Sequence, residues 1–282
     1  MAKDLAQMGT AHVRKTRYLN QSAIEKQNTS EVEIHFYQHC APLLKESGVN
    51  SPSIYQADPL SNKLVMEFIP TTISAEALFL EPKALAHLAA IHKLSPSQII
   101  GPDSKTDKHP LNTIALHTHE WTQQQTDITF ACLRLPDQTM AFIENIRSRS
   151  QCLFRKDHLI SGDSNHGNWG LRENGELVQF DWERFGYGSP AIDLAPMIPK
   201  MGARDDYKNI AKRYAQFNPY APLNEIIKQV VYAKVWIITE VVSLLETRHN
   251  PEKQRYFDWF NQKLPQWTDA VQAWPEFGDL NQ

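Results

Sequence analysis

The residues between Asn168 and Asp181 have the types and spacing of a divalent-cation site. Within this stretch the Asn174-Gly175 dipeptide, flanked by alternating apolar residues, predicts a two-residue β-hairpin turn. Counting outward places Asn168 opposite Asp181 on one face, and Trp169 opposite Phe180 on the other. Directly opposed Cβ atoms lie roughly 5 Å apart, and carboxylate and amide oxygens are ligands of Mg²⁺. A polar hairpin edge at the surface explains the same pattern, so the flanking sequence has to decide.

Upstream of the hairpin, Asp163 precedes Asn168 by five positions. This is the spacing of the catalytic loop in phosphotransferases. There the aspartate accepts the proton of an attacking hydroxyl, the asparagine holds a metal, and a second aspartate bridges metal and nucleotide. Asp163, Asn168 and Asp181 fill these three positions.

Three motifs follow one another between about 159 and 195: Gly162-Asp163 with Gly167-Asn168, then Phe180-Asp181-Trp182-Glu183, then Gly186-Tyr187-Gly188-Ser189-Pro190-Ala191-Ile192-Asp193-Leu194-Ala195. Together they resemble the aminoglycoside phosphotransferase and choline kinase superfamily, and the hairpin is also similar to that of fructosamine kinases. The resemblance implies an α+β, bilobal protein-kinase-like fold. It further implies ATP and Mg²⁺ as co-substrates and a small molecule that carries the acceptor hydroxyl.

One position departs from the family pattern. Ser161 stands where the family usually has a histidine that supports the loop, which puts the rigidity of the loop in doubt more than its chemistry. Asp193 matches a further aspartate of the family, and the resemblance implies that it braces the catalytic loop. From the sequence alone, an N-cap for the helix that follows is an equal alternative.

In the first part of the chain, Lys26 at the end of an expected strand resembles the lysine that contacts the α- and β-phosphates. Glu33 on the following helix resembles the glutamate that positions this lysine. Glu31 competes for that role, and Glu33 also completes a capping-box pattern with Ser30. An ordinary exposed strand lysine is the alternative for Lys26.

The expected hinge follows the strand 63–68, where Pro70 ends the apolar run. The resemblance implies that backbone groups of Glu67, Phe68 and Ile69 bind adenine. A phosphate-covering loop is expected near Gly9, since such loops present backbone N–H groups to phosphates. A single glycine is weak support for that loop.

Periodicity divides the chain into a small mixed N-terminal lobe of residues 1–70 and a helical C-terminal lobe of residues 71–282. The resemblance implies that the first lobe, including the hinge, binds the nucleotide and that the second carries the catalytic loop and the substrate site. Strands are expected at Val13–Leu19, Ser22–Gln27 and Lys63–Phe68, and a loop at Ser95–Pro110. Helices are expected at Thr29–Gly48 (bent or restarted at Pro42), Glu81–Leu94, Leu111–Thr126, Asp137–Ser150, Ala191–Pro199, Asp205–Phe217, Leu223–Arg248 and Glu252–Ala273.

The overall composition is that of a globular protein. A net charge of −3 over 282 residues argues against a nucleic-acid partner. The N-terminus lacks the apolar core of a signal peptide, and charges interrupt every apolar stretch, so no membrane partner is expected. Three cysteines suit a reducing compartment, which predicts a cytoplasmic protein. The sequence does not indicate an oligomeric state.

Two other groups of residues have the types found in functional sites. His35 with His39, and His117 with His119, have spacings that zinc accepts, but no zincin pattern accompanies them. Aromatic residues of the C-terminal helices either box a cationic substrate through cation–π contacts or belong to the core. The core is favoured for this set: Tyr232, Trp236, Trp259 and Trp267.

The sequence therefore predicts an ATP-dependent small-molecule kinase. The main alternative is a catalytically weak or inactive nucleotide-binding protein with the same fold, favoured by the sparse glycine loop and Ser161. A protein kinase is disfavoured, because the segment from Asp181 to Asp193 leaves no room for an activation loop. The acceptor stays open: an aminoglycoside needs acids such as Glu183, choline needs aromatics, and a sugar needs neutral polar groups.

Overall fold

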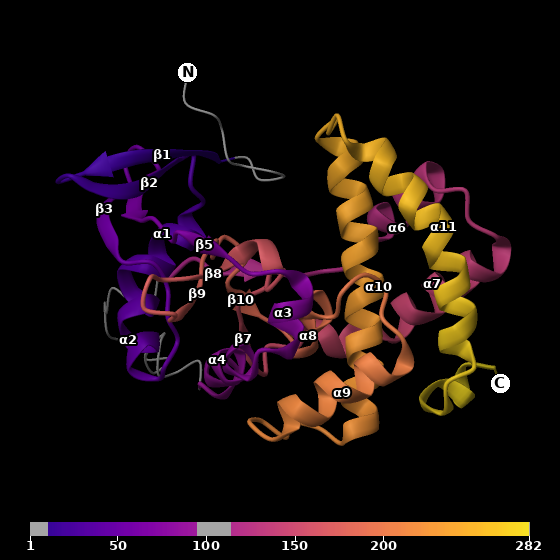
Figure 1. The fold of residues 1–282 in the computed structure, drawn as a ribbon. Coiled ribbons are helices and arrows are strands. Elements are labelled where there is room, and N and C mark those ends of the chain that lie inside the picture. The colour runs from indigo at the N-terminus through magenta and orange to yellow at the C-terminus, as the bar shows by residue number, and fades with distance from the viewer. Residues whose placement is uncertain (1–10, 95–113, 282) are drawn as a thin grey trace, which may run out of the picture.

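The computed structural model describes residues 11–94 and 114–281. A β-sheet with short helices forms one side of the molecule, and helices form the other (Figure 1). The hairpin of the candidate site lies between these two parts. Among the described residues, no helix has the length and apolar character needed to cross a membrane. The α+β bilobal fold expected from the resemblance is confirmed.

The N-terminal sheet contains β1 (His12–Tyr18), β2 (Gln21–Gln27), β3 (Ile54–Asp58) and β4 (Lys63–Glu67) in the order β1-β2-β4-β3. All neighbours are antiparallel. The turn between β1 and β2 has φ of 44° at Leu19 and 67° at Asn20, as a two-residue type I′ turn requires. The three predicted strands are confirmed, and β3 was not predicted.

The predicted bent helix after β2 is also confirmed. It consists of α1 (Glu31–His35), a π-helical turn (Phe36–Cys40) and α2 (Ala41–Glu46). Ser30 caps α1 by accepting a hydrogen bond from the backbone N–H of Glu33 at 3.2 Å. Pro42 lies in the first turn of α2, where its missing N–H costs nothing.

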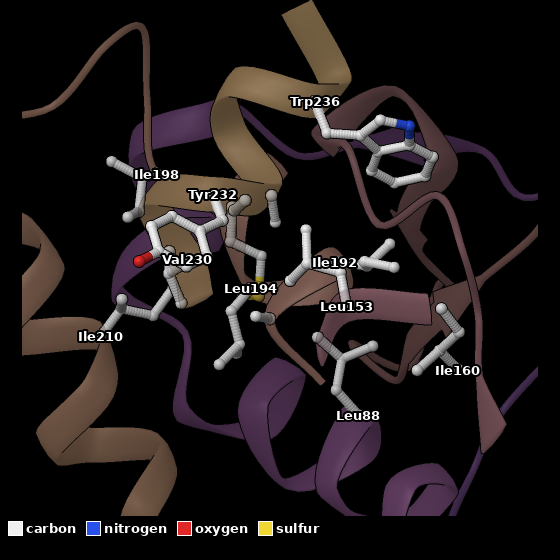
Figure 2. Packing of buried hydrophobic residues seen from close by; sticks show 14 of the residues in the cluster. Leu88, Leu153, Ile160, Ile192, Leu194, Ile198, Ile210, Val230, Tyr232 and Trp236 are labelled. Atoms are coloured by element: carbon white, nitrogen blue, oxygen red, sulfur yellow. The ribbon is translucent and has the colours of Figure 1, made fainter. Parts of the chain in front are cut away.

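The second part is built around α10 (Leu223–Thr247), most of whose residues are buried. The other helices are α3 (Ala75–Leu80), α4 (Pro82–Lys93), α6 (Gln123–Cys132), α7 (Asp137–Arg149), α8 (Ala191–Met197), α9 (Arg204–Ala215) and α11 (Lys253–Gln272), with 3₁₀ turns at Ser150–Phe154 and Pro275–Asn281. Figure 2 shows part of the core, to which α10 contributes Val230 and Trp236 and α8 contributes Leu194.

One predicted helix, Leu111–Thr126, is wrong over most of its described length. Residues 114–122 are not helical, and His117–Thr118 form the short strand β6. The helix begins only at Gln123, because Thr122 forms a capping box with Gln125. Residues 111–113 of that prediction and the predicted loop Ser95–Pro110 lie outside the described residues.

The aromatic residues of the C-terminal helices belong to the core, as favoured. Tyr232, Trp236 and Trp267 are buried, and Trp259 is half-buried against the same cluster. The indole Nε1 of Trp236 donates to the carbonyl of Glu120 at 2.9 Å. These side chains therefore stabilise the packing of α10 and α11.

Candidate active site

The candidate catalytic loop begins after β7 (Leu159–Ile160) and ends in a 3₁₀ turn, His166–Asn168. Gly162 starts it with φ of 80°, and a Cβ there would lie 2.2 Å from the carbonyl oxygen of Arg184. Only glycine fits this position. The amide of Asn168 donates to the carbonyl of Asp163 at 3.1 Å, which closes the loop on itself.

Asp163 lies half-buried in this loop, and Asn165 holds its carboxylate through an Nδ2–H···Oδ1 hydrogen bond of 2.6 Å. Burial raises the pKa of Asp163, and the guanidinium of Arg184 partly offsets that rise. A carboxylate with a raised pKa is better suited to accept a proton than an ordinary surface aspartate.

The hairpin after the loop differs from its predicted register by one residue. The strands β8 (Trp169–Leu171) and β9 (Leu177–Gln179) pair Trp169 with Gln179 and Leu171 with Leu177. The connecting loop has three residues rather than two. Gly175, with φ of 78°, donates to the carbonyl of Arg172 at 2.9 Å, which makes a type I turn followed by a glycine bulge.

As a consequence, Phe180 and not Asp181 lies opposite Asn168, and its N–H donates to the carbonyl of Asn168 at 2.9 Å. The predicted common face of Trp169 and Phe180 is also wrong, since paired residues share a face and Trp169 pairs with Gln179. Asp181 leaves the strand direction with φ of 66°. The argument for a metal site from strand opposition alone therefore fails.

Asp181 is instead placed by an ion cluster with the first lobe. The Nζ of Lys26 lies 2.6 Å from Oδ1 of Asp181 and 2.6 Å from Oε2 of Glu33. The side chains of Lys26 and Glu33 are 7% and 1% exposed, whereas that of Asp181 is 37% exposed. Lys26 is thus not an ordinary exposed lysine. Glu31 is exposed, and Glu33 is the partner of Lys26.

The charges of this cluster perturb one another. Burial alone would lower the pKa of Lys26, but Glu33 and Asp181 outweigh it and raise that pKa. Burial raises the pKa of Glu33 to about 7, although the nearby ammonium of Lys26 acts against the rise. Groups with such perturbed pKa values concentrate at functional sites.

Asn168 and Asp181 have the donor chemistry that Mg²⁺ requires. The Nδ2 of Asn168 is engaged with Asp163, and its Oδ1 has no hydrogen-bond partner in the described part of the chain. Among the same residues, Oδ2 of Asp181 is likewise without a partner, while Oδ1 contacts Lys26. Mg²⁺ is usually held by one or two such oxygens together with substrate phosphates and water.

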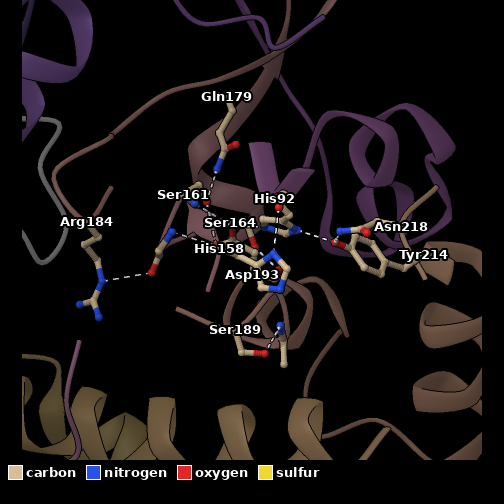
Figure 3. A network of polar contacts seen from close by, with 12 residues as sticks. His92, His158, Ser161, Ser164, Gln179, Arg184, Ser189, Asp193, Tyr214 and Asn218 are labelled. Carbon is tan, nitrogen blue, oxygen red and sulfur yellow. Dashed lines mark hydrogen bonds and ion pairs between the residues drawn. The ribbon is translucent and has the colours of Figure 1, made fainter. Parts of the chain in front are cut away.

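Asp193 braces the candidate catalytic loop from below (Figure 3). Its fully buried carboxylate accepts hydrogen bonds from the N–H of Ser161 at 2.7 Å, the hydroxyl of Ser161 at 2.9 Å and the N–H of Gly162 at 2.8 Å. The hydroxyl of Ser164 donates to its carbonyl. The N-cap alternative is wrong, because Asp193 lies inside the first turn of α8, whose N-cap is Pro190.

Ser161, which stands where the family usually has a histidine, is itself hydrogen-bonded and holds the loop in place. Besides bonding Asp193, its hydroxyl accepts from Nε2 of Gln179 at 2.9 Å. On the other side, His92 of α4 lies with Nε2 at 2.9 Å from Asp193 and Nδ1 at 2.6 Å from the hydroxyl of Tyr214. The sequence did not single out His92, Gln179 or Tyr214, because they come from distant elements.

Arg184 is a further residue that the sequence did not single out. Its Nη2 lies 2.8 and 2.7 Å from the two carboxylate oxygens of Glu240, and its Nε donates to the carbonyl of Gly162 at 3.2 Å. The neighbouring Glu183 has no hydrogen-bond or ion-pair partner among the described residues. Burial and the charge of Asp181 raise the pKa of Glu183.

The expected hinge residues lie at the end of β4. The N–H of Glu67 donates to Ser53 at 2.8 Å, so it is already satisfied within the protein. The Nζ of Lys15 lies 3.8 Å from the ring centroid of Phe68. Phe68 and Ile69 are half-buried. Gly9, the expected centre of the phosphate-covering loop, lies outside the described residues.

The histidine pairs do not form zinc sites in the described ranges, where no group of three metal-ligating side chains is found. His35 accepts a hydrogen bond from the N–H of Ala115 at 2.9 Å. His119 packs beside Gly162 and lies with Nε2 at 3.0 Å from the carbonyl of Arg184. Both therefore have structural contacts.

The β-sheet part, the helical part and the loop and hairpin between them form a bilobal, kinase-like α+β fold. No family model matches the chain, and no curated protein matches it significantly in sequence. In fold, however, the chain is similar to solved structures. Among them are aminoglycoside and macrolide phosphotransferases and choline and ethanolamine kinases, which agrees with the resemblance seen in the sequence.

Three of these structures illustrate the similarity. A macrolide 2′-phosphotransferase type I has a TM-score of 0.64 at 11% identity, over 91% of this chain and 88% of that one. The choline kinase LicA from Streptococcus pneumoniae has a TM-score of 0.61 at 14% identity, over 96% and 93%. The spectinomycin phosphotransferase APH(9)-Ia, in complex with ADP and spectinomycin, has a TM-score of 0.60 at 13% identity, over 96% and 92%. At these identities the likeness concerns the fold.

Proposed function

We propose that this protein is an ATP-dependent phosphotransferase that moves the γ-phosphoryl group of ATP to a hydroxyl of a small molecule. The observation that carries the proposal is the ion cluster of Lys26, Glu33 and Asp181, which joins the first lobe to the hairpin next to the loop of Asp163. The desolvation of a buried lysine and its carboxylates can cancel the attraction between them, so stability alone is a weak reason for such a cluster. The positive charge of Lys26 is suited to bind the phosphates of a nucleotide.

In this mechanism Asp163 orients the acceptor hydroxyl and takes its proton, for which its raised pKa is suited. Lys26, held by Glu33, neutralises charge on the phosphates. Asn168 and Asp181 would hold Mg²⁺ as its protein ligands, and the ion would neutralise charge on the phosphates. Most of the rate enhancement then comes from positioning and electrostatics.

The backbone of Phe68 and Ile69 would bind the adenine, together with the carbonyl of Glu67, whose N–H is already used. The acceptor is a small hydroxyl compound. Macrolides, spectinomycin and choline are acceptors named for the neighbours, and an aminoglycoside, a choline-like compound or a sugar fits the proposal.

We place the protein in the cytoplasm. All three cysteines are free, which supports a reducing compartment.

The test uses purified protein and Asp163→Asn, which keeps the shape of the side chain and removes its basicity. Wild-type protein should be stabilised in a thermal-shift assay by Mg-ATP and should turn over ATP with at least one member of a hydroxyl-compound panel. The variant should keep the thermal shift and lose about 10²-fold or more of the turnover. Absence of any Mg-ATP shift in wild-type protein would overturn the proposal. A shift without turnover across the panel would favour the inactive nucleotide-binding alternative.

A further inference from the structure

The hinge between the lobes is fastened to the hairpin that carries the candidate metal ligands. Arg172, directly after β8, donates from Nε and Nη2 to the two carboxylate oxygens of Glu67 at 2.7 and 2.8 Å. Its Nη2 also donates to the carbonyl of Ser51 at 3.0 Å, and its Nη1 to Glu176 at 2.5 Å. We call the bidentate pair of Arg172 and Glu67 the hinge clamp.

The hinge also lies directly against β8 beyond the clamp. Residues Thr71–Thr72 form the strand β5, which pairs with Leu171 and Gly170. A Cβ on Gly170 would lie 2.7 Å from Cγ2 of Ile69 and 2.7 Å from the carbonyl oxygen of Thr71. Only a residue without a side chain allows this approach, so the hinge is held against the strand along its length.

This contact links the two ends of the proposed nucleotide site. Glu67 marks the base-binding end, and Asn168, four residues before Arg172, marks the metal end. An extended strand advances about 3.3 Å per residue, so β8 separates the clamp from Asn168 by roughly 13 Å. Asp181 follows the partner strand β9 at the same end of the hairpin as Asn168.

We propose that Arg172 is a positioning residue that fixes the spacing between the base-binding hinge and the metal ligands. This inference rests on the proposed function. The side chains of Arg172 and Glu67 are each 21% exposed, so the pair acts more through its fixed two-bond geometry than through charge alone. Lysine, with a single ammonium, cannot reproduce that geometry.

The experiment compares two ligands. AMP reports on the base end, and Mg-ATP spans both ends. With Arg172→Met, the Kd of Mg-ATP by calorimetry should rise about tenfold, equivalent to about 1.4 kcal/mol. The Kd of AMP should change less than about twofold, because the base end alone does not need the spacing. Arg172→Lys should show the same split, although it keeps the positive charge.

Arg204→Met is the matched control, because Arg204 makes a comparable bidentate pair with Glu276, at 3.0 and 2.7 Å, between α9 and the C-terminal 3₁₀ turn. It should leave both affinities unchanged. Gly170→Ala keeps the clamp but pushes the hinge outward, and it should weaken Mg-ATP more than AMP.

Equal losses for AMP and Mg-ATP in both Arg172 variants would overturn the positioning role, and so would unchanged affinities. Wild-type protein that binds neither ligand would overturn the proposed function itself, so the two failures are distinguishable.

Discussion

Removing the lysine of the buried ion cluster should give the protein a pH-dependent loss of stability. In the wild-type protein, Glu33 has a pKa of about 7 because burial raises it against the lowering effect of Lys26. In Lys26→Met that lowering effect is gone, so the pKa of Glu33 rises further. Above about pH 7 the folded variant then keeps a proton that the wild-type protein and the unfolded chain have released.

The sign and size follow from linkage. A folded state that binds more protons than the unfolded chain loses stability as the pH rises, by up to about 1.4 kcal/mol per pH unit for one group. The stability difference between wild type and Lys26→Met should therefore grow from about pH 7 upward. This difference stops growing at the pH at which Glu33 of the variant ionises. Its upper limit is about 3–5 kcal/mol, the usual cost of removing one partner of a buried ion pair. The exposed side chain of Asp181 adds little.

The assay is urea denaturation of both proteins across this pH range. Lys26→Met combined with Glu33→Gln should remove the pH dependence, because glutamine does not titrate. Lys63→Met is the control, since Lys63 pairs with Glu25 at 3.1 Å on the same sheet and is 32% exposed. A stability difference that stays constant with pH, or one that shrinks, would refute a buried ion pair between Lys26 and Glu33.

Three further predictions concern buried polar groups. Asp193→Asn puts an amide N–H₂ where a carboxylate oxygen accepted backbone N–H bonds, so urea denaturation should show a loss of about 3 kcal/mol and turnover should fall with it. Trp169→Phe removes the 3.1 Å bond from the indole to the carbonyl of Ser164 and should cost about 2 kcal/mol by the same measurement. Burial lowers the pKa of Lys234 to about 7. Between this value and the ordinary pKa of lysine, only the unfolded chain keeps the proton. The stability of the wild-type protein relative to Lys234→Met should therefore rise by about 1 kcal/mol per pH unit in this range. A difference that falls over this range would contradict the last expectation.

The elements that the sequence predicted well are those whose signals are local. Ser30 and Pro42 mark the helix after β2, and the apolar periodicity of α10 marks the central helix. The helix expected from Leu111 began at Gln123 instead, because the capping box of Thr122 outweighed a continuous polar-apolar pattern before it. β3 was missed since its half-buried residues lack a clear alternation.

The residues that hold the site in place were harder to predict. Asp163, Asn168 and Asp181 occur within a short stretch with recognisable spacing. His92 of α4 and Tyr214 of α9 support the same loop indirectly through Asp193, and Glu240 of α10 does so through Arg184. Only the packing of these helices brings them there. A single sequence carries no signal for such contacts, because they join residues that lie far apart in the chain.

The predicted register of the hairpin is wrong, yet Asp181 still lies in an ion pair with Lys26 of the first lobe. Asn174-Gly175 correctly marks the turn, but Gly175 serves as a bulge after a three-residue loop, and the pairing shifts by one residue. With regular strand geometry this shift would turn Asp181 away from Asn168. The left-handed backbone conformation of Asp181 breaks the regular alternation of side chains along the strand, and Lys26 of the first lobe holds its carboxylate in an ion pair. The position of this carboxylate is thus set by an ion pair across the lobes, and the same pair is what Mg-ATP would have to reorganise on binding.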